Sequence, residues 1–256
     1  MARIQLSYQG FGTDSMDIIV PQYGESRMDR EMEREAFYNR KFPVLWLLHG
    51  GMGCSSDWLR FTEVERFAAE KHLFVVCISG ENGCYADMAH GNHWSSFLNG
   101  YVWDLIHDMF PLASDRPEDN YIAGLSMGGY GALRNGLAHP EKYGVIGSFS
   151  GAVSMVQQYA KGEKFPPNME NVFGNQALGT VNDTWYLAEK LAKEGKAPKV
   201  YLACGTKDSL FDSNLEYRAH LEGLGYDLTW DQEDYGHEWA FWNSQIEKFI
   251  AFLPEK

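Results

Sequence analysis

The sequence has few cysteines, and it has no long apolar run. Its four cysteines (Cys54, Cys77, Cys84, Cys204) include no C-x-x-C pair, so their spacing does not suit a zinc site. Free thiols are expected, with a Cys54–Cys84 disulfide as the alternative. No apolar run approaches the ~20 residues of a membrane span. The first ten residues, MARIQLSYQG, also lack the apolar core of a signal peptide, so we expect a cytoplasmic protein without a bound metal.

Positive charge is scarce as well. The chain carries 22 Lys and Arg against 35 Asp and Glu, which gives a net charge of -13. A protein that binds nucleic acid or an anionic membrane needs a concentrated basic face, and none is visible. The expected partner is therefore a small molecule, with no nucleic acid and no membrane. The sequence leaves the oligomeric state open, a homo-oligomer included.

Short apolar runs alternate with helical patterns along the whole chain. Runs at 44–49, 73–79, 120–125 and 145–150 are mostly apolar, which indicates strands buried on both faces. Further strands are expected at 199–205 and 227–233, and RIQLSY and DIIV near the N-terminus could form an antiparallel pair. Helical patterns lie at 94–110, at 211–224 and in the last 15 or so residues. This alternation predicts an α/β fold, with a mostly parallel sheet covered by helices on both faces, in a single domain spanning 1–256.

Two segments fit this alternation poorly. Residues 22–41 carry the mixed-charge run ESRMDREMERE, which predicts a solvated loop or a short helix. Residues 151–198 separate two core strands by far more than a normal crossover, and they include Pro166 and Pro167. Insertions of this length are often substrate-binding caps, so we expect a cap or lid here.

Ser126 lies in the most informative motif of the chain. The run Gly124-Leu125-Ser126-Met127-Gly128 matches G-x-S-x-G, between a predicted strand and a helical stretch. A nucleophile on a sharp strand-to-helix turn has a strained backbone, and glycine neighbours avoid collisions with adjacent chain. The Met127 amide, at the helix N-terminus, would point to where an oxyanion forms. A glycine-rich packing turn is the alternative, but the flanking strand and helix favour a nucleophile.

A serine nucleophile needs a histidine base. Three histidines follow Ser126 in the chain: His139, His220 and His237. His139 precedes a proline at the end of the first helix after Ser126, and His220 lies within a helical pattern. His237 follows the last predicted strand, where this class of fold places its base, so we favour His237.

The base in turn needs an acid that orients it. Asp208 comes four residues after Cys204, at the end of the preceding strand, and Asp212 follows one turn later. We favour Asp208 because Asp212 is expected within a helix, where it would point less readily at the base. Three further carboxylates are too close in sequence to His237 to reach its ring: Asp231, Glu233 and Asp234.

A second glycine-rich loop follows the strand at 44–49. It reads HGGMG (49–53), and its glycines allow backbone to approach a substrate oxygen closely. We take the Gly51 amide as an oxyanion donor, with Met52 as the alternative. A phosphate-binding P-loop is excluded, since no G-K-[ST] follows.

Five motifs appear in the order HGGMG, YADMAHG, GLSMGGYGA, CGTKD and GHEW. Together they resemble the esterase D group of α/β-hydrolases, which includes S-formylglutathione hydrolases, tributyrin esterases and the feruloyl and acetyl-xylan esterases of carbohydrate esterase family 1. The resemblance covers roughly residues 1–253. It implies an α/β-hydrolase fold and a serine carboxylesterase without cofactor. It also implies a triad of Ser126, Asp208 and His237, with the amides of Gly51 and Met127 as the oxyanion hole.

The resemblance leaves the substrate open. S-formylglutathione hydrolases typically carry an S-G-L-T loop where this chain has H-G-G-M, which disfavours a glutathione thioester. We therefore expect short-chain acyl esters, with feruloyl or acetyl esters of plant carbohydrates as candidates and a thioesterase or an acyltransferase as alternatives. Trp94, Tyr85 and Trp239 are the candidates for contact with the acyl group, although each could instead be a core residue.

Overall fold

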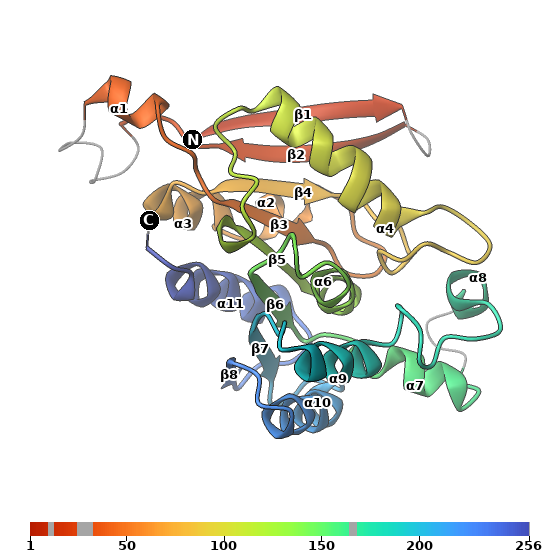
Figure 1. The fold of residues 1–256 in the computed structure, drawn as a ribbon. Coiled ribbons are helices and arrows are strands. Elements are labelled where there is room, and N and C mark those ends of the chain that lie inside the picture. The colour runs from red at the N-terminus through yellow and green to blue at the C-terminus, as the bar shows by residue number, and fades with distance from the viewer. Residues whose placement is uncertain (10–12, 25–32, 164–167, 256) are drawn as a thin grey trace.

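The computed structural model describes residues 1–9, 13–24, 33–163 and 168–255 (Figure 1). Their centre is one eight-stranded sheet with the strand order β1-β2-β4-β3-β5-β6-β7-β8. The strands are β1 Ala2–Gln9, β2 Thr13–Val20, β3 Val44–Leu48, β4 Phe74–Ile78, β5 Asn120–Leu125, β6 Val145–Phe149, β7 Lys199–Gly205 and β8 Leu228–Glu233.

The sheet is parallel from β4 to β8, and its two antiparallel pairs both involve β2. β1 pairs with β2, and β2 joins the sheet by antiparallel pairing with β4. The other pairs, from β4–β3 to β7–β8, are all parallel. Every residue of β3, β4, β5 and β6 is buried, as the apolar runs predict. The prediction of a mostly parallel α/β sheet is confirmed.

Helices cover both faces of the sheet, and the side chains of each strand divide between them. Leu45 and Leu47 of β3 pack with α2 (Asp57–Phe61), α3 (Val64–Lys71) and α11 (Trp239–Phe252). Trp46 and Leu48 pack on the opposite face, together with residues of α6 (Met127–Ala138), α9 (Thr184–Glu194) and α10 (Phe211–Gly223). This alternation along one strand is what a sheet buried on both faces requires.

The helix predicted at 94–110 has an irregular middle. It comprises α4 (Trp94–Ser96), a π-helical turn at Phe97–Val102 and α5 (Trp103–Met109). In the mixed-charge segment 22–41, a short helix α1 (Arg34–Tyr38) forms, and residues 25–32 lie outside the described part of the chain.

The long segment 151–198 divides into two parts. Helices α7 (Met155–Ala160) and α8 (Met169–Phe173) lie at one end of the molecule, whereas α9 packs against α6 as the crossover helix between β6 and β7 (Figure 1). Because α9 is a crossover helix of the sheet, only the remainder of 151–198 is left for the expected cap, which stays a prediction. Pro166 and Pro167 lie outside the described residues.

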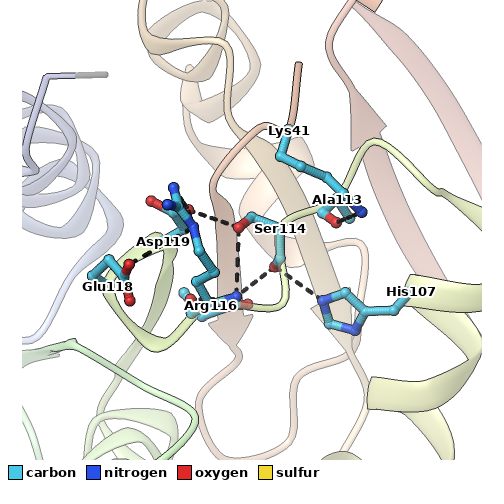
Figure 2. A network of polar contacts seen from close by, with 8 residues as sticks. Lys41, His107, Ala113, Ser114, Arg116, Glu118 and Asp119 are labelled. Carbon is cyan, nitrogen blue, oxygen red and sulfur yellow. Dashed lines mark hydrogen bonds and ion pairs between the residues drawn. The ribbon is translucent and has the colours of Figure 1, made fainter. Parts of the chain in front are cut away.

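A polar cluster holds the start of β5, the strand that leads to Ser126 (Figure 2). Asp119 accepts hydrogen bonds from the Ser114 hydroxyl at 2.7 Å and from Arg116 Nε at 2.8 Å. Asn120 Nδ2 donates to the Ser114 carbonyl oxygen at 2.7 Å, and His107 Nε2 lies 3.0 Å from the same oxygen. These bonds fix the entry of the strand, because buried polar groups are costly to leave unpaired.

All four cysteines are free thiols, so the alternative of a Cys54–Cys84 disulfide is wrong. Among the residues that the structure describes, no helix is both long and apolar enough to span a membrane.

Candidate active site

Ser126 sits on a strained turn between β5 and α6. Its backbone has φ 53° and ψ -118°, a conformation that costs a non-glycine residue about 1–3 kcal/mol. Neighbouring chain holds it there: the Ser126 amide donates to the Phe149 carbonyl at 2.9 Å, and the Ser126 carbonyl accepts from the Ala152 amide at 3.1 Å. The turn is thus tied to the end of β6, which stabilises an otherwise unfavourable geometry.

The glycines beside Ser126 are required by close backbone packing. A Cβ on Gly124 would lie 2.3 Å from the Gly128 carbonyl oxygen, and a Cβ on Gly128 would lie 2.3 Å from the Leu48 carbonyl oxygen. Both contacts are with backbone, which cannot move aside as a side chain can. The glycine pattern therefore lets α6 begin directly against the carboxyl end of β3.

His237 lies between Ser126 and Asp208. Its Nε2 is 3.0 Å from Ser126 Oγ, and its Nδ1 is 2.8 Å from Asp208 Oδ2. The three side chains come from the loops after β5, β8 and β7, whose carboxyl ends meet at one edge of the sheet. The Trp242 ring lies edge-on to the imidazole, with 5.0 Å between centroids.

Asp208 is 5% exposed, and its carboxylate accepts two hydrogen bonds: Oδ2 from His237 Nδ1 at 2.8 Å and Oδ1 from the Leu210 N–H at 2.9 Å. Burial alone would raise its pKa, but the bonds from His237 and from the Leu210 amide outweigh burial and lower it. The carboxylate is thus ionised at neutral pH and can accept a hydrogen bond from a protonated His237 Nδ1. Asp212, the rival acid, is exposed on α10, so it is Asp208 that the structure brings to His237.

The two expected oxyanion donors, the amides of Met127 and Gly51, both lack a hydrogen-bond acceptor in the described part of the chain. Met127 is the first residue of α6, and neither its N–H nor that of Gly51 has an acceptor among the described residues. The Met52 N–H, by contrast, donates to Asn82 Oδ1 at 2.7 Å. Of the two alternatives in the HGGMG loop, Gly51 is the amide left available.

Two of the three expected substrate contacts are corrected by the structure. Tyr85 and Trp94 are both 0% exposed, so neither side chain is available to a ligand. The Tyr85 hydroxyl instead bonds to the backbone of His49, and Trp94 packs against Phe97. Trp239 is partly exposed, and its ring packs against that of Phe61, with 4.8 Å between centroids.

Two polar residues to which the sequence analysis gave no role lie around the site. Asn82 Oδ1 accepts a hydrogen bond from the Met52 N–H at 2.7 Å, and His49 Nε2 accepts one from the Gly80 N–H at 3.0 Å. Each follows a parallel strand, as the triad residues do, and this position is the one signal that could have identified them. The site remains open to solvent at His237, whose side chain is 36% exposed. Two surface cavities of about 460 and 530 Å³ lie elsewhere, and no triad residue lines either of them.

Comparisons with known proteins bear on the class of the protein. A family model described as "Putative esterase" matches residues 26–253. An acetyl esterase of Caldicellulosiruptor saccharolyticus is 29% identical over 265 residues, which cover 100% of this chain and 99% of the relative. Among solved structures, the fluorophosphonate-binding serine hydrolase F of Staphylococcus aureus is 28% identical with a TM-score of 0.86. An S-formylglutathione hydrolase of the same organism is 28% identical with a TM-score of 0.82, and both alignments cover 98% of each chain.

Proposed function

Because this chain belongs to the esterase family, has the α/β-hydrolase fold and is a carboxylic ester hydrolase, we propose that Ser126, His237 and Asp208 perform the hydrolysis. The observation that carries the proposal is the position of His237, hydrogen-bonded to Ser126 on one side and to Asp208 on the other. A hydroxyl is a weak nucleophile at neutral pH, and this arrangement supplies the base and the acid that it needs.

In the proposed reaction, Ser126 Oγ attacks the ester carbonyl while His237 Nε2 takes the hydroxyl proton. The negative charge that develops on the carbonyl oxygen is stabilised by the N–H groups of Gly51 and Met127. His237 then gives its proton to the leaving alcohol, and an acyl-enzyme remains on Ser126. Water, activated by the same histidine, attacks the acyl-enzyme and releases the acid. Asp208 keeps Nδ1 protonated and stabilises the imidazolium throughout.

The preferred substrates are short-chain acyl esters, acetyl esters among them. The full-length relative at 29% identity is an acetyl esterase, which supports this choice. The case for feruloyl esters is weaker than the sequence suggested, because Tyr85 and Trp94 are buried and cannot stack on a hydroxycinnamoyl ring. A glutathione thioester is the second candidate, since a structural relative at 28% identity is an S-formylglutathione hydrolase.

We take the described parts of the segment 151–174, residues 151–163 and 168–174, as a cap beside this site. The Ala152 amide bonds to the Ser126 carbonyl, which places the start of the segment at the nucleophile. The amides of Ala89 and His90 donate to carbonyls of Val172 and Asn171 at 3.0 and 2.8 Å, which joins α8 to the loop after β4. A cap supported at both ends suits a small acyl group better than a long one.

A substrate panel tests this proposal. We expect kcat/KM to be highest for p-nitrophenyl acetate or butyrate and to fall by p-nitrophenyl octanoate, with Ser126→Ala inactive on all of them. S-formylglutathione, methyl ferulate and acetylated xylan complete the panel, and product analysis with an added alcohol detects acyl transfer. A maximum of kcat/KM at long acyl chains would contradict the assignment to short-chain esters. A kcat/KM for S-formylglutathione far above that for every oxygen ester would assign the protein as a thioesterase instead.

A further inference from the structure

The loop that carries Gly51 is intrinsically flexible, yet it must hold an amide with precision. Gly50, Gly51 and Gly53 give its backbone more freedom than other residues would. An oxyanion donor, however, acts only when its N–H lies about 2.7–3.1 Å from the developing charge. Something outside the loop must therefore fix its position.

Four hydrogen bonds from one neighbouring segment do so. Met52 directly follows Gly51, and its N–H donates to Asn82 Oδ1 at 2.7 Å. The His49 N–H donates to the Tyr85 hydroxyl at 2.8 Å, and this hydroxyl lies 3.3 Å from the His49 carbonyl oxygen, to which it donates. The Gly80 N–H donates to His49 Nε2 at 3.0 Å. All the partners belong to residues 80–85, so the loop is held on both sides of Gly51 by the segment that follows β4.

Tyr85 is suited to this role because it stays protonated. Its side chain is 0% exposed, and burial raises its pKa well above the ordinary value. A protonated hydroxyl can accept from the His49 N–H and donate to the His49 carbonyl at the same time. Phenylalanine at this position would keep the ring and lose both bonds.

Tyr85 also connects the two proposed oxyanion donors to each other. Its carbonyl oxygen accepts from Asn135 Nδ2 at 3.0 Å, and Asn135 lies on α6, the helix that begins with Met127. Its ring packs so closely on α6 that a Cβ on Gly131 would lie 2.5 Å from Cδ2. The distance between the Gly51 and Met127 amides is thus set partly through this one side chain.

We propose that Tyr85 and Asn82 are positioning residues of the oxyanion hole, which hold the Gly51 amide at the distance from the Met127 amide that the transition state requires. The proposal rests on the proposed function, since it assigns these residues to the same reaction. Neither side chain touches the reacting atoms. Their effect is therefore expected on transition-state stabilisation and not on substrate binding.

The test compares Tyr85→Phe and Asn82→Ala with a matched control, Tyr217→Phe. Tyr217 is another fully buried tyrosine, whose hydroxyl donates to the Thr184 carbonyl at 3.2 Å, between α10 and α9. All three variants lose hydrogen bonds, but only the first two loosen the loop that carries Gly51. Asn82 is exposed, so Asn82→Ala keeps the proposal testable even if Tyr85→Phe fails to fold.

Three quantities are measured with p-nitrophenyl acetate as the substrate. They are kcat, KM and the inhibition constant of a short-chain trifluoromethyl ketone. Such a ketone forms a tetrahedral oxyanion on the serine, so its affinity reports on the oxyanion hole directly. We expect Tyr85→Phe and Asn82→Ala to lower kcat about 10- to 100-fold, part of the 10²–10³ that losing a whole donor costs, with KM changed less than about threefold. The inhibition constant should rise by the same factor as kcat/KM falls, and Tyr217→Phe should leave both unchanged.

Three results would overturn the proposal. In the first, the kcat and the ketone affinity of both Asn82→Ala and folded Tyr85→Phe equal those of the wild type, while Ser126→Ala is inactive; the positioning role is then wrong and the proposed function stands. In the second, Ser126→Ala keeps its activity, and the proposed function falls together with the positioning role. A loss of activity in Tyr217→Phe equal to that in Tyr85→Phe would also reject the proposal, because any buried hydroxyl would then have the same effect.

Discussion

Replacing Asp208 with asparagine should disable His237 while changing the size of the side chain very little. Both carboxylate oxygens accept hydrogen bonds: Oδ2 from His237 Nδ1 at 2.8 Å, and Oδ1 from the Leu210 N–H at 2.9 Å. Asparagine has one acceptor oxygen and one NH₂ group, so it cannot satisfy both donors. Either the NH₂ group faces the Leu210 N–H, or it faces His237.

The second orientation reverses the tautomer of the base. If the asparagine NH₂ donates to His237 Nδ1, that nitrogen is unprotonated and the ring proton moves to Nε2. Nε2 then cannot accept the proton of Ser126. The equivalent change in trypsin, a different protein, lowers kcat about 10⁴-fold, which corresponds to about 5 kcal/mol of activation free energy. We expect a loss of about 10³- to 10⁴-fold here.

Asp212→Asn is the matched control, since Asp212 is an exposed aspartate four residues further on, within α10. Both variants are assayed with p-nitrophenyl acetate at pH 7–8, and their circular dichroism is compared with that of the wild type. Asp212→Asn should retain nearly full activity. If Asp208→Asn kept most of its activity, or if Asp212→Asn were the worse variant, the assignment of the acid would be wrong.

The remaining predictions concern packing, pH and the mouth of the site. Gly128→Ala should lower the free energy of unfolding by about 1–3 kcal/mol in a urea titration and impair activity, because its Cβ would collide with the Leu48 carbonyl; unchanged stability would refute this. The pKa of Asp208 is lower in the folded state than the ordinary carboxyl value of about 3.9, so its ionised form stabilises the folded state. This stabilisation is fully present above the ordinary pKa, and it is lost as pH falls through the lower pKa of the folded state. The stability advantage of the wild type over Asp208→Asn should therefore be constant from pH 5 to 7 and shrink below about pH 4, and a growing advantage in acid would contradict the pKa argument. Trp239→Ala should raise KM for p-nitrophenyl butyrate about tenfold with a smaller change in kcat; a lower melting temperature with unchanged KM would make Trp239 a packing residue.

The parts of the site that sequence reasoning located well are those that follow from topology. Parallel strands bring their carboxyl ends to one edge of a sheet, so side chains just after β5, β7 and β8 must lie near one another. This is why the G-x-S-x-G motif together with chain order led to Ser126, Asp208 and His237, and why the structure finds them within hydrogen-bonding distance. The positions of the strands could also be predicted from the sequence, since each buried strand is a short apolar run.

Tyr85 and Trp94 were misjudged because their placement depends on backbone angles that the sequence does not reveal. Cys84 and Tyr85 adopt left-handed conformations, with φ 54° and 53°. This sharp turn directs the Tyr85 ring beneath the HGGMG loop, where its hydroxyl reaches His49, and not toward solvent. Neither residue is a glycine or an asparagine, so residue type does not mark their left-handed backbone, although Asn82-Gly83 just before them favours a turn.

The helix predicted at 94–110 forms, but the side chains expected on its buried face are not all buried. Phe97, Tyr101, Leu105 and Met109 recur at four-residue spacing, which predicts one helical face. The π-helical turn at Phe97–Val102 rotates that face, and Tyr101 and Met109 are 49% and 50% exposed, whereas Val102 and Ile106 are buried. A π-turn inserts part of a residue into the helical repeat, and its occurrence depends on tertiary packing more than on local preference.

The central claim is that Ser126 carries the acyl group during turnover. The most direct measurement is the mass of the protein and of its peptides after rapid quenching with p-nitrophenyl acetate, or after reaction with diethyl p-nitrophenyl phosphate. We predict one acetyl or diethylphosphoryl group per chain, located on the peptide that contains Ser126, and no such adduct in Ser126→Ala. An adduct on another residue, or the same adduct in Ser126→Ala, would contradict the account.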